Sequence, residues 1–188
     1  MGFKANIGFA ILDLRIVTLL VLVASAVLLV TDNYKLSDGD KTSFKDVFAY
    51  RYVVATAAIG VVYLILQLPF AIYYAYTEKR LIRGELLPQF DFYADKIVSL
   101  LLASGVGAGF AVSFELKKIL PDAFDVIIGI AQATGNADFD ETIQLFEQEK
   151  SKTPGFLNKG IIASGILLVG CLLMAIVSVL SSLNRSSK

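Results

Sequence analysis

Histidine is absent from this sequence of 188 residues, and cysteine occurs once, as Cys171. Without histidine, the chain has no imidazole for general acid–base catalysis, for a proton switch near neutral pH or for metal binding. A single cysteine excludes a disulfide within the chain and a site made of four thiolates. We therefore expect no catalytic residue, no cofactor and no metal site, and we expect that the protein is not an enzyme.

The chain also lacks an excess of charge of either sign, because 17 Lys and Arg balance 17 Asp and Glu. Proteins that bind nucleic acid usually carry a basic surface, so the zero net charge argues against such a partner. Apolar residues, in contrast, make up 56% of the sequence. Soluble domains contain about 45–50% apolar residues, and the composition therefore favours a membrane protein.

Four long apolar segments stand out, at about 11–31, 52–76, 92–114 and 160–183. Roughly 20 helical residues cross a hydrocarbon core of about 30 Å, so each segment is long enough to span a bilayer. Inside lipid each segment has to satisfy its own backbone hydrogen bonds, which predicts a helix for each. The predicted fold class is all-α, an integral membrane four-helix transmembrane bundle that forms a single domain over residues 1–188.

An even number of spans places both termini on one side of the membrane. The candidate inside segments, which are the two termini and the link 77–91, hold Lys4, Lys79, Arg80, Arg83, Arg185 and Lys188. The lysines of loops 32–51 and 115–159 are spread over about twice as many residues as these segments contain. By density, the positive-inside rule favours cytoplasmic N- and C-termini, a cytoplasmic loop at 77–91 and extracellular loops at 32–51 and 115–159.

The two extracellular loops contain local signals of their own. Residues 37–40 (SDGD) indicate a turn, and the aromatic stretch that follows has the spacing of a helical approach to the second span. In the second loop, apolar residues recur at helical spacing on both sides of a break at 134–136 (TGN), with Asp138 or Asp140 as a cap. We expect two short helices there, lying over the outer end of the bundle. The acidic residues of this loop lack calcium-loop spacing and are interpreted as a solvated face.

Small residues in the spans predict close helix contacts. Gly105 and Gly109 form a GxxxG pattern, and Ser104 with Ala108 repeats the small-residue spacing one position earlier. Gly160 and Ser164 have the same spacing in the fourth span. Two interpretations stay open: packing within one bundle, and contact between protomers. In the second span, Gln67 is expected to make a hydrogen bond between helices.

The first and third spans each carry one charge at a matching depth. Arg15 lies about one turn inside the first span, and Asp95 about one turn inside the third, and both spans start from the same side. A charge at this depth costs a few kcal/mol unless it finds a partner, so we predict an intramembrane ion pair between them. Alternatives are that Arg15 and Lys96 reach the lipid phosphates separately, or that the charges form a proton relay, which requires a chain of groups across the membrane.

Three segments together resemble a known family: AILDLRIVTLLVLVASAVLLVTDN, SFKDVFAYRYVVAT and DFYADKIVSLLLASGVGAGFAVSFELKK. They are similar to the Casparian strip membrane domain protein-like family of plants, which is related to the MARVEL domain. In that family an arginine in the first span and an aspartate in the third are hallmark positions, and Arg15 and Asp95 match them. The resemblance extends over essentially the whole chain.

The resemblance implies a plasma-membrane protein with both termini in the cytosol. Better-understood relatives self-associate into immobile membrane platforms that recruit secreted wall-modifying proteins. This chain lacks their first-loop stretch rich in phenylalanine and proline, and it lacks cysteines in the second outer loop. These departures favour a "-like" member with a less defined scaffold role.

Two hypotheses for function follow. The first is a non-enzymatic scaffold whose partners are other copies of itself or related members, the bilayer and secreted wall-modifying proteins. The second is a channel, a transporter or an accessory subunit of a membrane complex, which the intramembrane charges favour. The small number of polar residues within the spans argues against a pore in one protomer.

Overall fold

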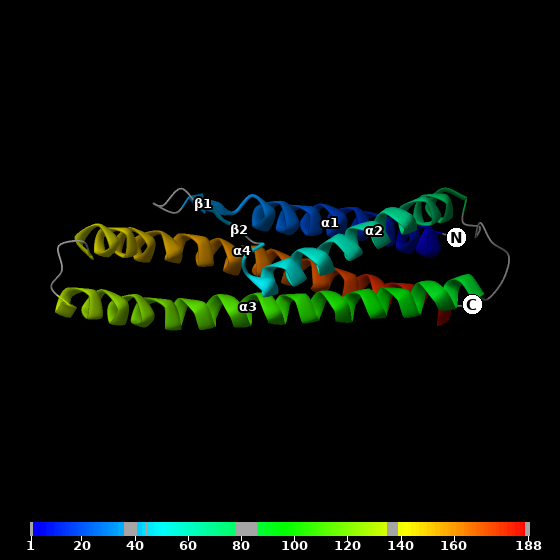
Figure 1. Cartoon of the computed structure of the whole chain (residues 1–188). Coiled ribbons are helices and arrows are strands. Elements are labelled where there is room, and N and C mark those ends of the chain that lie inside the picture. Colours follow the sequence, from blue (N-terminus) through cyan, green and yellow to red (C-terminus); the bar gives the residue numbers. More distant parts are fainter. Residues whose placement is uncertain (1, 36–40, 44, 78–85, 135–138, 187–188) are drawn as a thin grey trace.

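The computed structural model describes residues 2–35, 41–43, 45–77, 86–134 and 139–186. Four long helices account for most of them: α1 (Gly2–Val30), α2 (Phe48–Thr77), α3 (Leu86–Thr134) and α4 (Phe139–Ser186). All four are long and apolar enough to cross a membrane, so the predicted four-helix transmembrane class is confirmed. The start of α1 and the end of α4 lie at the same end of the bundle (Figure 1).

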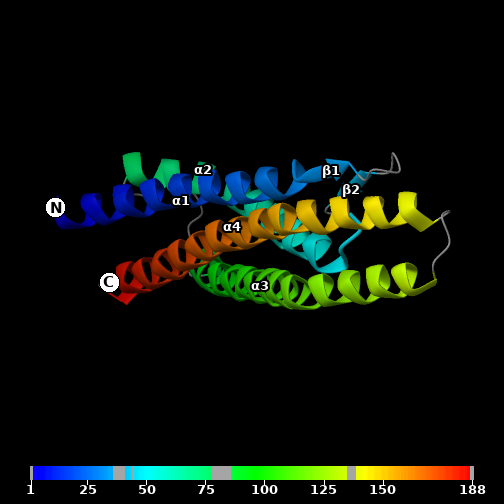
Figure 2. The ribbon, with the colours of Figure 1, turned by 90° about the vertical axis from the view of Figure 1, so that its left-hand side faces the viewer.

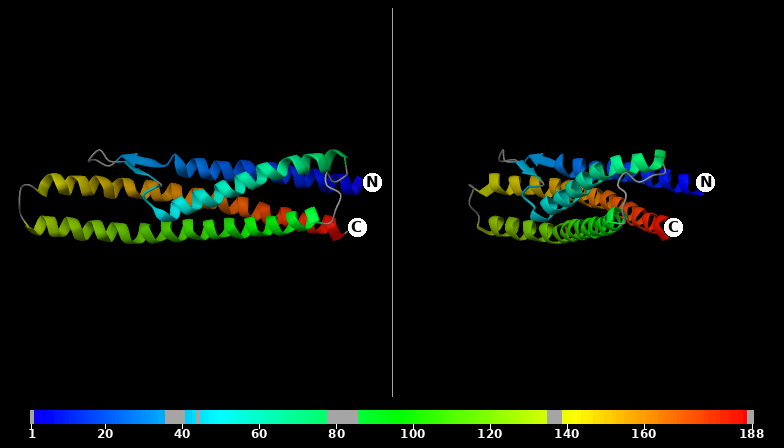
Figure 3. Two further views of the ribbon diagram at one scale, coloured as in Figure 1. Left: turned by 45° about the vertical axis from the view of Figure 1, so that its right-hand side comes forward. Right: turned by 90° about the vertical axis from the view of Figure 1, so that its right-hand side faces the viewer.

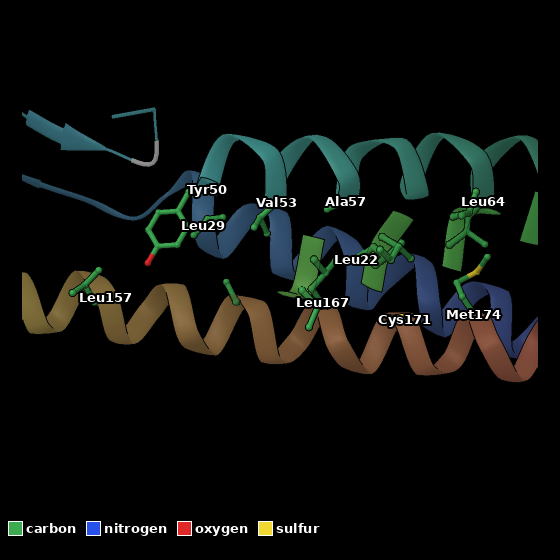
Figure 4. Packing of buried hydrophobic residues seen from close by; sticks show 14 of the residues in the cluster. Leu22, Leu29, Tyr50, Val53, Ala57, Leu64, Leu157, Leu167, Cys171 and Met174 are labelled. Atoms are coloured by element: carbon green, nitrogen blue, oxygen red, sulfur yellow. The ribbon is translucent and has the colours of Figure 1, made fainter. Parts of the chain in front are cut away.

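The helices form a ring in chain order, because α1 packs against α2 and α4, and α3 packs against the same two helices (Figure 2). Large side chains fill the centre, including Leu22 of α1, Leu64 of α2 and Leu167 of α4, which are all fully buried (Figure 4). Leu102 of α3 is fully buried as well. The outward faces are apolar as well, as at Leu100, which is 71% exposed. Helices that are apolar all round are expected of a bundle surrounded by lipid.

The second outer loop differs from the prediction. Its described residues, 115–134 and 139–159, are helical, as expected, but they continue the spans instead of forming separate short helices over the bundle. α3 has 49 residues and α4 has 48, so each is about 70 Å long at about 1.5 Å per residue. Together they project well beyond α1 and α2 as a helical hairpin (Figure 3).

The hairpin stays helical because its apolar spacing continues that of the spans. Phe124 of α3 meets Phe146 of α4 with ring centroids 6.2 Å apart, and Lys150 pairs with Asp125. α3 ends at Thr134, at the predicted break. Asp138 and the side chain of Asp140, the predicted caps, lie outside the described part of the chain.

The segment between α1 and α2, predicted as an extracellular loop, contains a short ladder that the sequence did not predict. Strands β1 (Asn33–Lys35) and β2 (Lys41–Ser43) pair antiparallel, with Tyr34 opposite Thr42. The predicted turn at 37–40 falls outside the described residues. α2 begins at Phe48, so the predicted helical approach to the second span is part of the span's own helix.

Candidate functional site

The most concentrated polar chemistry of the described residues lies inside the bundle, near the end that holds the start of α1. Arg15 of α1 is 4% exposed and Asp95 of α3 is 0% exposed. Nη2 of Arg15 lies 3.2 Å from Oδ2 and 3.4 Å from Oδ1 of Asp95, and it donates to both oxygens. The structure therefore brings the two sequence-predicted charges together as a buried ion pair.

The second span supplies two further members of this cluster. The Tyr63 hydroxyl donates to Oδ1 of Asp95 at 2.5 Å, and Nη1 of Arg15 donates to Oε1 of Gln67 at 2.9 Å. The side-chain amide of Gln67 then donates to the hydroxyl of Tyr63 at 3.3 Å. Gln67 is 5% exposed, and it makes the interhelical hydrogen bonds expected of it.

Asp91 completes what we call the inner network, which consists of Arg15, Tyr63, Gln67, Asp91 and Asp95. Nε2 of Gln67 donates to Oδ1 of Asp91 at 2.9 Å. The network joins α1, α2 and α3 at one depth. Because its donors and acceptors are turned toward one another in a low-dielectric interior, it suits holding three helices in register better than carrying an ion or a proton across the membrane.

The sequence did not identify Tyr63 and Asp91 as members of the inner network, although a local signal existed. Tyr63 and Gln67 are four residues apart on α2, and Asp91 and Asp95 are four residues apart on α3. Residues at this spacing share one helix face, so each pair presents two polar groups in the same direction. The signal shows which side chains point together but not which helix they meet.

The glycine pattern of α3 lies inside the bundle. A Cβ atom at Gly105 would collide with the hydroxyl oxygen of Thr56 in α2, and one at Gly109 would collide with the hydroxyl oxygen of Ser164 in α4. Both glycines let α3 approach its neighbours within the same chain. Of the two interpretations left open by the sequence, the structure places these positions in packing within one bundle.

The other small residues divide between the interior and the surface. Gly160 lies against the Tyr50 ring, and Ser164 is buried and donates to the Gly160 carbonyl at 2.8 Å. Ala108 is half-buried, whereas Ser104 is exposed and its hydroxyl lies 2.7 Å from that of Tyr52. Because Ser104 also donates to the Leu101 carbonyl, Tyr52 is the donor in this pair.

A second buried carboxylate lies at the other end of α1. Asp32 is 2% exposed. Its Oδ1 lies 3.1 Å from Nζ of the exposed Lys159, and the two side chains form an ion pair. Burial raises the pKa of the Asp32 carboxyl, and the hydrogen bond and charge of Lys159 oppose that rise. Asp32 therefore joins the start of the β1–β2 ladder to α4 at some electrostatic cost.

Among the described residues, no group of three or more histidine, cysteine, aspartate or glutamate side chains is placed to hold a metal ion. Four apolar helices closed around a buried polar network define an integral, multi-pass membrane protein. Residues 5–119 match the family described as the Casparian strip membrane protein domain. The chain belongs to that family.

Named relatives extend this match over most of the chain. It is 36% identical over 176 residues to CASP-like protein 4D1 of Ricinus communis, an alignment that covers 92% of this chain and 89% of the relative. It is 34% identical over 175 residues to CASP-like protein 4D2 of Arabidopsis thaliana, covering 92% and 87%. No solved structure matches the chain.

Proposed function

We propose that this protein is a non-enzymatic scaffold of the plasma membrane that self-associates laterally and organises a membrane domain. The observation that carries the proposal is the combination of family membership with the inner network. Arg15 and Asp95 pair with each other and with Tyr63 and Gln67 at a single depth, and only Nε of Arg15 among the buried polar atoms of the network lacks a partner. Leu22, Leu64 and Leu102 fill the bundle beyond it. Such an interior supports a structural role over transport.

The projecting hairpin supports the second part of the proposal, recruitment of secreted wall-modifying proteins. About 20 residues of α3 extend past the last apolar turn of its span, which is about 30 Å of helix. With both termini in the cytosol, this hairpin stands on the extracellular side, where such partners are found.

Self-association is tested by energy transfer between two differently labelled copies in one membrane. Efficient transfer that persists when unlabelled bystander membrane protein is added supports the scaffold. Transfer no greater than that between two unrelated four-span proteins at the same density contradicts it.

Topology is tested by glycosylation. The substitution Asp138→Ser creates an acceptor sequon at Asn136, between α3 and α4, while the natural sequon at Asn184 follows the last span. The proposed orientation predicts a glycan at Asn136 that Asn136→Gln removes, and none at Asn184. A glycan at Asn184 contradicts it.

A channel, a transporter or an accessory subunit is the second candidate, because charges buried in a membrane often mark ion pathways. Ion flux across proteoliposomes discriminates between the two candidates. Flux above that of empty vesicles, lost on Asp95→Asn, favours this alternative over the scaffold.

A further inference from the structure

The last part of helix α3 lies beyond the hydrocarbon core. The helix carries no charge between residues 97 and 114, a stretch of about 27 Å, which is close to the roughly 30 Å of a bilayer core. Five charged residues follow within three turns: Glu115, Lys117, Lys118, Asp122 and Asp125. Residues beyond this point are therefore in the headgroup region or in water.

One face of this outer part of α3 is nevertheless apolar. Ile119 is 50% exposed, Val126 is 60% exposed and Ile130 is 63% exposed. Ala123 and Ala133 lie on the same face, so that apolar residues follow one another at steps of four, three, four and three. We call these five residues the outer stripe. Lipid covers the exposed apolar side chains of the spans, but it does not reach this far.

The outer stripe continues a face that is already an interface lower down. Gly105 of α3 faces Thr56 of α2. Ala123 lies 18 residues, or about five turns, beyond Gly105, and therefore on the same side of the helix. α2 begins only at Phe48, and α3 extends far beyond that point (Figure 1). Inside the membrane α2 covers this side, and outside it α2 does not.

A second copy of the chain fits the outer stripe on two grounds. Copies inserted in one membrane with one topology hold their α3 helices parallel, with equivalent residues at equal height. The alternating steps of four and three are those of the core positions of a left-handed coiled coil, and between parallel helices such a coil pairs a stripe with its own copy. Confinement to a membrane also raises the effective concentration of the partner. A contact of about two heptads can therefore be long enough for two copies to pair.

The charges beside the outer stripe are compatible with such a pair. Lys118 and Asp125 of α3 lie outside the stripe, and Asp125 is bound by Lys150 of the same chain. Asp122, at the edge of the stripe, would face Ile127 of the other copy in the coiled-coil register, so that no two like charges meet.

We propose that the outer stripe, from Ile119 to Ala133, is the contact between two copies of this chain. The inference rests on the proposed self-association and gives it a surface. It assigns the contact to a face that the chain leaves exposed in water, in place of Gly105 and Gly109, which are covered within the bundle.

Cross-linking in intact membranes tests the contact. In a Cys171→Ala background, which removes the only native cysteine, Val126→Cys is compared with Lys118→Cys, an exposed position of the same helix that lies outside the stripe, about 80° around the helix from Val126. Treatment with a short bismaleimide is expected to give covalent dimers several-fold more efficiently for Val126→Cys. Equal yields at both positions indicate random collision and contradict the proposal.

A second variant separates the surface from self-association itself. Ile119→Lys with Val126→Lys changes exposed positions and leaves the spans intact, and it is expected to reduce energy transfer between copies several-fold; Lys118→Glu is the matched control. Undiminished transfer in the double variant overturns the outer stripe as the contact but leaves the scaffold standing. Absence of transfer in the wild-type protein overturns both.

Discussion

The ion pair between Arg15 and Asp95 is the residue-scale feature with the largest expected effect. Asp95→Ala leaves the Arg15 guanidinium buried without a carboxylate, which typically costs about 3–5 kcal/mol. We expect a large loss of protein at the cell surface, measured by surface biotinylation. The swap Arg15→Asp with Asp95→Arg should restore surface delivery in part, because the charges pair again while the Tyr63 hydroxyl loses its acceptor. No recovery in the swap would show that the two charges act separately.

Tyr63 is the test of the inner network beyond the pair. Tyr63→Phe removes the 2.5 Å hydrogen bond to Asp95 and keeps the ring. Hydrogen bonds to charged groups contribute about 1.5–3 kcal/mol, so a clear drop in thermal stability in detergent is expected. Tyr52→Phe is the control, because its hydroxyl binds Ser104 on the exposed surface. Equal stability losses in the two variants would argue against a special role for the network.

Asp32 makes the fold sensitive to pH. Its pKa is raised by burial, so the folded protein binds a proton at this site more readily than the unfolded chain does. The cost of burying the ionised carboxylate is therefore relieved as the pH falls through the raised pKa, and it returns as the pH rises. Relative to Asp32→Asn, the wild-type protein should gain stability in thermal melts as the pH falls toward the raised pKa of Asp32. A parallel pH dependence in both proteins would contradict this assignment.

At this scale, the sequence could predict the role of a side chain only where that residue differs chemically from the residues around it. Arg15 and Asp95 stand out because each is an ionisable group in an apolar span at a matching depth, and the structure places them in contact. Tyr63 has no such contrast, since a tyrosine in a span is equally typical of an aromatic anchor. Only the approach of α2 to α3 gives its hydroxyl a role.

At the scale of elements, α3 offers a matched pair of glycines. Gly105 faces Thr56, whereas Gly107, two residues on, has open space around it. Gly105→Leu forces α2 and α3 apart and should cost at least about 1–3 kcal/mol, with loss of folded protein in size-exclusion chromatography. Gly107→Leu should be tolerated. Equal tolerance of both substitutions would show that α2 does not pack against Gly105.

The helical hairpin of α3 and α4 shows why helix ends were harder to predict than helices. The charges from Glu115 onward predict the end of the apolar span, but they do not predict the end of the helix. Helical backbone does not need lipid, however, and apolar residues such as Leu120 and Phe124 continue the packing face. The β1–β2 ladder was missed because strands of three residues carry almost no periodic signal.

At the scale of the whole molecule, the number of spans followed from length and hydrophobicity alone, because the cost of burying backbone in lipid leaves few solutions. The ring order of the helices did not, since four apolar helices can pack in several ways of similar burial. Specific contacts between helices decide the ring order. One example is Ser25 of α1, whose hydroxyl donates to the Ala163 carbonyl of α4 at 2.7 Å.

We propose that the scaffold is laterally fixed in the membrane. Its most direct test is photobleaching of a fluorescent fusion in the native plasma membrane. A laterally fixed scaffold should show slow or absent recovery in restricted patches, and faster recovery for Ile119→Lys with Val126→Lys. Rapid, complete recovery of the wild-type protein over the whole surface would contradict the account.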